Sequence, residues 1–320
     1  MSGLSALGGC RIGHADDGRT GATAVVFDPP VQMGVAVHGG APGTRETDLL
    51  RPGHLNPPVD ALTLCGGSAF GLAAADGAQA TLLAAGRGFA VGAVRVPIVP
   101  GAIIFDLVDA VADYRALGAN ACAAALLGDD EREGSVGAGV GATTATVRGG
   151  LGLAVEQTKA GGVGALVVNN AVGSPIAANG PWFRAAPFER DAEFGGLVAP
   201  PHADFARVET KLARAGEGTV IALIVTDATL DTAALTGLAR GAHDGIALGI
   251  YPAHTLLDGD TVFAASTARR PPPAGLSAHV ALGAAATRAL TRALTRAVVH
   301  ATPASGPGPP AWSTRFPTRT

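Results

Sequence analysis

A glycine–threonine pair, Gly218–Thr219, precedes a run of six apolar residues at positions 220–225. Apolar runs of this length that are rich in β-branched residues are typical of buried strands. If the Gly218–Thr219 bond were cut, Thr219 would carry a free α-amine beside its own hydroxyl. An α-amine has a pKa of about 8, so part of it is uncharged at neutral pH and can serve as the base of a threonine nucleophile. The same residues also fit a turn glycine followed by a threonine that begins a strand.

Ser68 is a second candidate nucleophile, because it lies between an expected strand at 59–64 and an expected helix at 69–85. A serine at such a turn is the nucleophile of α/β-hydrolases, whose motif reads GxSxG. Here Gly66 to Gly71 reads GxSxxG, which is one residue too long. The alternative interpretation is that Ser68 caps the helix, since serine is a preferred N-cap residue.

The glycine-rich segment 136–142 contains GxGxG. A dinucleotide-binding motif requires GxGxxG at the start of a helix, with an acidic residue about 20 positions later. The residues that follow, 143–147, favour a strand instead. The segment therefore does not predict a nucleotide site.

The composition narrows the possible partners. The chain has 320 residues, of which 15% are charged, and its formal net charge is −3. No basic patch stands out, so nucleic acid is not an expected partner. The cysteines Cys10, Cys65 and Cys122 are odd in number and form no CxxC pair, which fits a reducing compartment and predicts neither a disulfide framework nor a zinc site. The eight histidines lack HxH and HExxH spacing.

The N-terminal residues 1–7 contain no basic residue of the kind that begins a signal peptide. No apolar run approaches the length of about 18 residues that is needed to span a bilayer. We therefore expect a soluble, cytoplasmic protein without a membrane partner.

The elements that must position these residues alternate between strand and helix patterns. Strands are expected at 21–28 and 33–38, joined by a turn at Pro29 and Pro30, and then at 59–64, 164–169, from 219, and 261–264. Helices are expected at 69–85, 105–117, 201–214, 231–243 and 276–300, the last with arginines on one face at 288, 292 and 296. Residues 1–302 are expected to form a single domain, and the Pro- and Gly-rich residues 303–320 a disordered tail.

Six segments match, in order, the pattern of one known family. They are RTGAT at 19–23, GGAPGTRETDLL at 39–50, CGGSAFGL at 65–72, RVPIVP at 95–100, VGAG at 136–139 and LLDGD at 256–260. With these motifs the chain resembles the L-aminopeptidase/D-esterase family, which also contains β-peptidyl aminopeptidases and nylon-oligomer hydrolases. The segment 39–50 is the most specific, and the resemblance covers roughly residues 13–267.

The resemblance implies an α/β fold, a four-layer αββα sandwich of the N-terminal-nucleophile (Ntn) hydrolase type with the family's own strand connectivity. Family members are made as one precursor that cuts itself before a Ser or Thr, and the two chains stay together. The resemblance implies that in this sequence the cut would fall between Gly218 and Thr219 and would yield an α chain, 1–218, and a β chain, 219–302 plus the tail. The resemblance also implies homo-oligomers of αβ units, and no metal or organic cofactor is needed.

Three further residues match positions to which the family assigns roles. Asn170, at the end of an expected strand, matches the asparagine whose side-chain N–H supports the oxyanion. Asp258 and Asp260 match an acidic pair that lies beside the nucleophile's amine in the nylon-oligomer branch, whereas the aminopeptidase branch has Ser and Glu there. The alternatives are an Asx turn for Asn170 and a solvated turn for the two aspartates.

Two departures from the family pattern concern the substrate side of the site. Some relatives have a tyrosine where Phe105 stands, and phenylalanine cannot donate that hydrogen bond. Relatives also carry a lysine near the position of Thr146, where the nearest cations in this sequence are Arg148 and Lys159.

The expected function is that of an amidohydrolase or aminopeptidase that cleaves its own Gly218–Thr219 bond. It would then hydrolyse amide bonds of small peptides or related amides through an acyl-Thr219 intermediate. A hydrolase with Ser68 as the nucleophile and an uncleaved binding or scaffold protein are the two alternatives.

Overall fold

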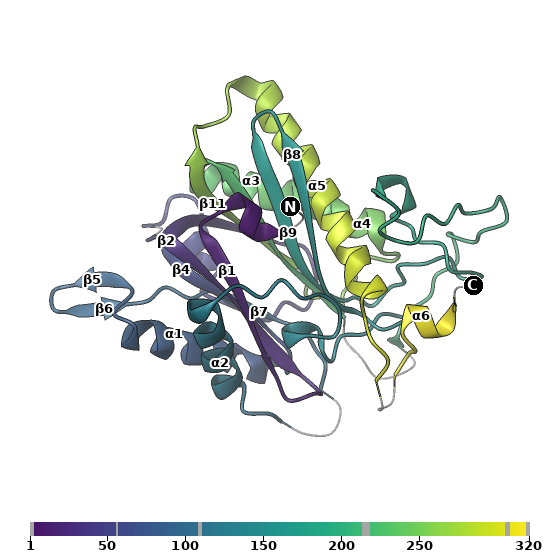
Figure 1. The fold of residues 1–320 in the computed structure, drawn as a ribbon, viewed down its shortest axis with the longest axis horizontal. Coiled ribbons are helices and arrows are strands. Elements are labelled where there is room, and N and C mark those ends of the chain that lie inside the picture. Colours follow the sequence, from purple (N-terminus) through teal and green to yellow (C-terminus); the bar gives the residue numbers. More distant parts are fainter. Residues whose placement is uncertain (1–2, 56, 108–110, 213–217, 305–307, 318–320) are drawn as a thin grey trace.

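The computed structural model describes residues 3–55, 57–107, 111–212, 218–304 and 308–317 (Figure 1). Nine strands form one hydrogen-bonded network in the order β3-β7-β4-β2-β11-β10-β9-β8, with β1 paired to β2. Their bounds are β1 (Cys10–Asp16), β2 (Gly21–Val37), β3 (Thr44–Arg45), β4 (Val59–Cys65), β7 (Gly101–Ile103), β8 (Gly150–Thr158), β9 (Gly161–Asn170), β10 (Thr219–Ala228) and β11 (Thr261–Arg270). A separate hairpin joins β5 (Phe89–Val91) to β6 (Val94–Val96).

The helices are α1 (Ala74–Ala84), α2 (Tyr114–Leu127), α3 (Thr232–Ala242), α4 (Asp244–Gly249), α5 (Gly275–Val299) and α6 (Trp312–Arg315). A 3-10 helix, η3 (Ser68–Ala73), precedes α1. The side chains of Asp113 and Asp231 cap α2 and α3 by accepting backbone N–H groups three residues later. Among the described residues, no helix combines the length and apolar character needed to cross a membrane.

Strand β2 belongs to two sheets. Its first half pairs with β1 and β4, and its second half, from Gln32 to Val37, pairs with β11. The pairing register with β4 shifts between Val26 and Val31, where Pro29 and Pro30 lack the N–H groups of a regular ladder. The two strands expected at 21–28 and 33–38 are therefore one strand, and the prolines mark its passage between sheets rather than a turn.

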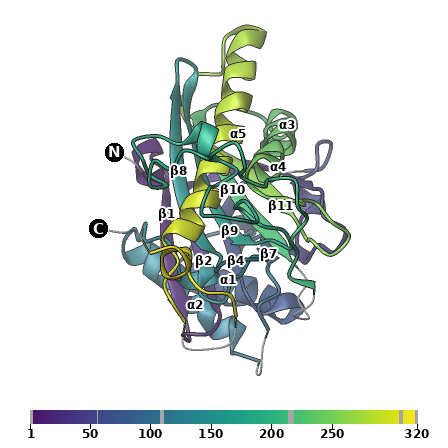
Figure 2. The same ribbon diagram turned by 90° about the vertical axis from the view of Figure 1, so that its right-hand side faces the viewer.

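Three apolar clusters separate four layers. In β10, Ile221, Leu223 and Val225 face a core that both sheets share, while Val220, Ala222 and Ile224 face α3, α4 and α5. A third cluster packs α1 and α2 against the outer face of β1, β2 and β4. Figures 1 and 2 show these two groups of helices on opposite sides of the strands. The protein therefore has the expected αββα sandwich.

The arginines of α5 are paired with buried carboxylates. Arg292 contacts both Glu156 on β8 and Glu193, each at 2.6 Å, and Arg296 pairs with Glu133 and Glu193. Glu156 is completely buried and also accepts hydrogen bonds from Arg190 and Arg288. This ion-pair network holds α5 against β8.

Three further expectations were wrong where the structure describes the residues. The expected helix at 105–117 begins instead at Tyr114, and the expected helix at 201–214 is absent from the described residues 201–212. The tail is ordered at 308–317, because α6 buries Trp312 and the main-chain oxygen of Pro310 accepts the Arg148 N–H. A four-residue helix with one buried tryptophan leaves little signal in a segment rich in Pro and Gly.

Candidate active site

Thr219 is the first residue of β10, and only 3% of its surface is exposed. Its hydroxyl donates a hydrogen bond to the carbonyl oxygen of Gly218, which is the oxygen of the peptide bond before it. The backbone N–H of Gly259 lies 3.1 Å from the same carbonyl oxygen and 3.3 Å from Thr219 Oγ1. The hydroxyl is therefore next to the bond that the sequence predicts to be cut, and an N–H group polarises that bond.

The turn at 255–260 brings both predicted aspartates beside this bond. Gly218 forms a parallel bridge with Asp258, and its N–H donates to the Leu257 carbonyl at 3.2 Å. Asp258 Oδ1 accepts the Val172 N–H at 3.0 Å, and Asp260 Oδ1 accepts the Val220 N–H at 2.7 Å. The aspartates are buried and hold the backbone at Val172, after β9, and at Val220, after Thr219, so they do not form the solvated turn.

The environment of Asp258 disfavours its charged form. Burial raises the pKa of its carboxyl, and the negative charge of Asp260 raises it further. Hydrogen bonds from the Thr255 N–H and hydroxyl to Oδ2, at 2.9 and 2.7 Å, act in the opposite direction. Burial and the charge of Asp260 therefore raise the pKa of Asp258, and the hydrogen bonds from Thr255 limit the rise.

The most specific sequence motif packs directly on this turn. A Cβ atom on Gly39 would lie 2.1 Å from the Asp258 oxygen and 2.4 Å from the Asp260 nitrogen. The N–H of Ala41 donates to the Asp258 oxygen at 2.9 Å. Glycine is needed at position 39 because only a residue without a side chain lets the two backbones approach so closely.

Asn170 lies directly opposite Thr219 in the antiparallel pair of β9 and β10. Side chains opposite one another in such a pair share a face of the sheet. Its Nδ2 donates to the Phe105 carbonyl at 2.9 Å, and its Oδ1 accepts the Thr143 N–H at 2.9 Å. The side-chain amide carries two N–H bonds, so a second one remains besides the one that holds Phe105.

Lys211 is a site residue that the sequence analysis missed. Its Nζ lies 2.7 Å from the Asn170 main-chain oxygen, 3.0 Å from Asn170 Oδ1 and 3.1 Å from the Thr143 oxygen. The residue is only 6% exposed, and burial lowers the pKa of its ammonium to about 7, against the opposing effect of nearby carboxylates. Its segment was expected to be helical, and no local pattern links it to Asn170.

The positions that depart from the family pattern contribute in other ways. Phe105 supplies its main-chain oxygen to Asn170. The hydroxyl of Thr146 forms a buried hydrogen bond of 2.9 Å with that of Ser174. Arg148 and Lys159, the nearest cations to Thr146 in the sequence, make no contact with Asn170 in the described residues, whereas Lys211 contacts both Asn170 and Thr143.

Ser68 does not show the contacts of a nucleophile. It begins η3 with a φ of 52°, and its backbone N–H donates to the Ile104 oxygen at 2.9 Å. Within the part of the chain that the structure describes, its hydroxyl makes no hydrogen bond to a histidine. Ser68 does not cap the helix either, because Gly67 occupies the N-cap position and Ser68 lies within η3.

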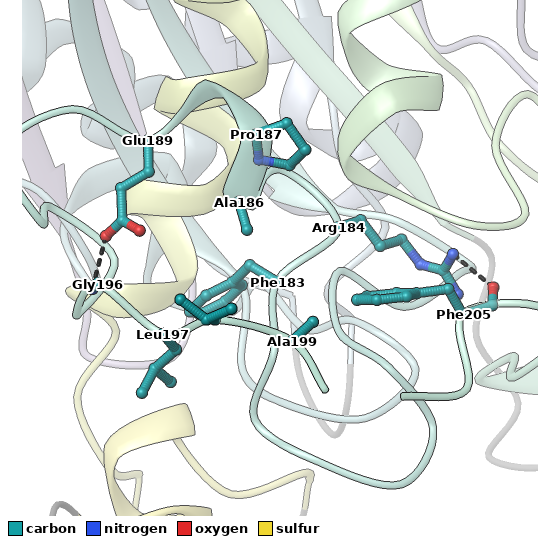
Figure 3. Close-up of a pocket in the computed structure, with 10 residues that line it drawn as sticks. Phe183, Arg184, Ala186, Pro187, Glu189, Gly196, Leu197, Ala199 and Phe205 are labelled. Carbon is teal, nitrogen blue, oxygen red and sulfur yellow. Dashed lines mark hydrogen bonds between the residues drawn. The ribbon is translucent and has the colours of Figure 1, made fainter. Parts of the chain in front are cut away.

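A cavity of about 570 Å³ opens elsewhere, between the segments 183–189 and 196–205 (Figure 3). Phe183, Leu197 and Phe205 contribute its apolar wall, and Arg184 lies beside Phe205 with its guanidinium 2.7 Å from the Phe205 oxygen. None of the predicted site residues lines this cavity. Among the described residues, the group of side chains suited to hold a metal ion is the trio His38, His243 and His254.

The four-layer αββα sandwich resembles the Ntn-hydrolase fold in its layout. Solved structures agree on the fold. A β-aminopeptidase from Burkholderia sp. matches 99% of this chain and 95% of its own with a TM-score of 0.66 and 22% identity. The L-aminopeptidase D-Ala-esterase/amidase of Ochrobactrum anthropi, described as a variant of the Ntn-hydrolase fold, matches 95% and 88% with a TM-score of 0.66 and 20% identity.

The chain belongs to peptidase family S58, whose model matches residues 4–309. An uncharacterized aminopeptidase of Mycobacterium tuberculosis is 43% identical over 304 residues, covering 87% of this chain and 86% of the relative. A 6-aminohexanoate-oligomer endohydrolase of Agromyces sp. is 30% identical over 276 residues, covering 81% and 73%. The protein is therefore a hydrolase that acts on peptide or amide bonds.

Proposed function

We propose that the protein is an N-terminal-threonine aminopeptidase or amidohydrolase that first cuts its own Gly218–Thr219 bond. The observation that carries this proposal is the hydrogen bond from the Thr219 hydroxyl to the Gly218 carbonyl oxygen. Proximity of this kind turns the attack into an intramolecular reaction, which strongly favours it. Ser68, the other candidate nucleophile, has no comparable arrangement in the described residues.

In the proposed self-cleavage, the hydroxyl of Thr219 reacts with the peptide bond that precedes it. Thr219 Oγ1 attacks the Gly218 carbonyl carbon, and negative charge develops on the oxygen that faces the Gly259 N–H at 3.1 Å. The C–N bond breaks, the α-nitrogen of Thr219 takes the hydroxyl proton, and an ester joins the two residues. Water then hydrolyses the ester, which leaves a carboxylate on Gly218 and restores the Thr219 hydroxyl beside a free amine.

The mature enzyme would use the same hydroxyl on a substrate. The α-amine of Thr219 accepts the hydroxyl proton as Oγ1 attacks the substrate carbonyl, and the departing amine takes a proton as its C–N bond breaks. The second N–H of Asn170 stabilises the oxyanion, and Lys211 orients the Asn170 amide from the other side. Water releases the acyl group from Thr219.

The two aspartates hold the new amine in place. Asp258 accepts a hydrogen bond from the Val172 N–H, and Asp260 accepts one from the N–H of Val220, the residue after Thr219. An ammonium at the chain start would lie between these carboxylates, which attract it and keep the nucleophile aligned. The substrate would be a small peptide or a related amide, and no metal or organic cofactor takes part in these steps.

The two chains are expected to stay together after the cut. Strands β10 and β11 of the β chain lie between β2 and β9 of the α chain in the sheet order. Separation would break the ladders on both sides of this pair and expose two shared cores. We also propose that the αβ units form homo-oligomers. The mass of the intact assembly under native conditions tests whether the two chains stay together and how many αβ units associate.

The deciding experiment is the intact mass of freshly purified, denatured protein. We expect two chains, 1–218 and 219–320, from the wild type and one full-length chain from Thr219→Ala. Thr229→Ala is the matched control, because Thr229 follows the same strand and is partly exposed. A wild-type chain that stays whole for days at neutral pH would contradict the proposal. Cleavage and amidase activity that persist in folded T219A would do so as well.

A further inference from the structure

Three histidines from distant parts of the chain meet beside the end of β2. His38 follows β2, His243 lies between α3 and α4, and His254 lies in the loop before Asp258. Their ring centroids are 3.9 Å apart for His38 and His243, 5.1 Å for His243 and His254, and 5.5 Å for His38 and His254. One ring nitrogen from each lies within 4.8 Å of those of the other two.

The ring of His243 leaves one nitrogen without a partner. Its Nε2 lies 3.0 Å from the Ala36 carbonyl oxygen, so Nε2 carries the hydrogen and Nδ1 carries a lone pair. His243 is only 1% exposed, and Nδ1 has no hydrogen-bond partner among the described residues. A buried acceptor that has lost water and gained nothing is unfavourable. A metal ion on this lone pair would remove that cost.

His254 is held as metal-binding histidines usually are. Its Nδ1 lies 2.7 Å from Asp260 Oδ2, and its backbone N–H contacts the same oxygen at 3.2 Å. A carboxylate on one ring nitrogen fixes the tautomer and the ring orientation. The ring also interacts with the His243 backbone, and a metal ion on Nε2 would replace that interaction. The backbone N–H of His38 donates to the main-chain oxygen of Asp260 at 3.0 Å, so the same aspartate contacts two of the three histidines.

We propose that His38, His243 and His254 form a binding site for one divalent transition-metal ion of the Zn²⁺ class, with its fourth position open. Hard cations such as Mg²⁺ and Ca²⁺ require oxygen ligands, whereas imidazole suits Zn²⁺, Cu²⁺ and Ni²⁺. Zn–N bonds are about 2.0–2.1 Å long, so the rings must draw closer than the present spacing.

His38 provides that movement. Its ring is stacked on His243 at an interplanar angle of 11°, so its lone pairs do not yet point at a shared position. The residue is exposed, which allows the ring to turn out of the stack. The buried His243 and the aspartate-bound His254 are the fixed part of the site.

The carboxylate of Asp260 connects the histidine site to β10, the strand that begins with Thr219. Asp260 contacts His254 through Oδ2 and the Val220 N–H through Oδ1. The proposal does not rest on self-cleavage, because all three histidines are in place in the uncleaved chain. It also leaves the amide chemistry without a metal.

The test is a calorimetric titration of ZnCl₂ into untagged protein that has been stripped with a chelator and dialysed. We expect saturation at one ion per chain in the wild type, and at least about tenfold weaker binding in His38→Ala. His279→Ala is the matched control, since His279 is also exposed but lies on α5. Its affinity should equal that of the wild type.

Co²⁺ gives a readout that needs no variant, because a site with three imidazoles produces visible absorption bands that hydrated Co²⁺ lacks. Growth of these bands to one equivalent, and their removal by excess Zn²⁺, would support the proposal. The proposal is overturned if no saturable binding occurs, or if folded H38A binds Zn²⁺ as tightly as H279A.

Discussion

The Nζ atom of Lys211 lies 2.7 Å from the main-chain oxygen of Asn170 and 3.0 Å from its Oδ1 atom. Asn170 is the residue opposite Thr219 in the sheet. The lysine thus fixes the amide from behind and brings a positive charge close to the place where the oxyanion of a substrate would form. Lys211→Met keeps the apolar volume but removes both effects.

We expect K211M to lower kcat by on the order of 10²-fold with little change in KM, since misplacement of an orienting group costs about this much. Steady-state kinetics on an aminoacyl anilide measures both constants. Lys159→Met, at the other lysine of the chain, is exposed and should leave both unchanged. A KM effect without a kcat effect would show that Lys211 acts on binding alone.

Lys211 also predicts how stability depends on pH. Burial lowers its folded pKa to about 7, whereas a lysine in the unfolded chain has a pKa of about 10.4. Between these values the unfolded state binds more protons, so stability rises with pH. We expect the wild type to gain stability relative to K211M by up to about 1.4 kcal/mol per pH unit in this window. Urea unfolding at pH 7, 8 and 9 measures it, and a constant difference would refute the lowered pKa.

Different donors serve the two reactions in the proposed mechanism, and Asn170→Asp separates them. The Gly218 carbonyl oxygen faces the Gly259 N–H, so self-cleavage does not need the Asn170 amide. Asp keeps an oxygen for Thr143 but loses the N–H that stabilises the substrate oxyanion. We expect turnover by N170D to fall by about 10²–10³-fold, while most of the chain is still cut. Mass spectrometry and kinetics on one preparation test this, and equal losses in both reactions would contradict it.

The residues of the proposed site differ in how far the sequence predicts them. Thr219, Asn170 and the Asp258–Asp260 turn stand at the ends of clear strand patterns, where local pattern and family motif agree. Lys211 has neither, because its contact with Asn170 joins positions 41 apart through a segment made mostly of loops. The grouping of the three histidines was not predicted from the sequence for the same reason. Motif searches test spacing along the chain, whereas His38, His243 and His254 meet only through the packing of α3 on β2.

The fold, too, is predictable from the sequence where a pattern is local and not where distant segments pair. Successive side chains of β10 are all buried and face the two cores in turn, which follows directly from the strand pattern. By contrast, Pro29 and Pro30 indicate an end to pairing without saying whether the chain turns back or continues. In the structure β2 continues and joins a second sheet, because β11 is there to pair with residues 32–37. That outcome depends on a strand more than 200 residues later.

Gly39 tests the contact between the glycine loop and the aspartate turn. A Cβ at this position would lie 2.1 Å from the Asp258 oxygen, so Gly39→Ala must displace the turn. We expect G39A to lose about 1–3 kcal/mol of stability, as forced overpacking does, and to accumulate uncut chain. Gly283→Ala is the control, because a Cβ there meets nothing within 4 Å. Normal cleavage by G39A would show that the position of the turn is not critical.

The ion-pair network between α5 and β8 is expected to make the stability of the protein sensitive to substitution of Glu156. Glu156 is fully buried and receives hydrogen bonds from Arg190, Arg288 and Arg292. Glu156→Gln leaves these cations without their shared charge, and breaking a buried pair costs about 3–5 kcal/mol. The exposed pair of Arg132 and Asp130 offers the control, since Asp130→Asn should cost at most about 1 kcal/mol. Chemical denaturation of both variants measures the difference, and equal losses would mean that water reaches the Glu156 network as freely as it reaches the surface pair.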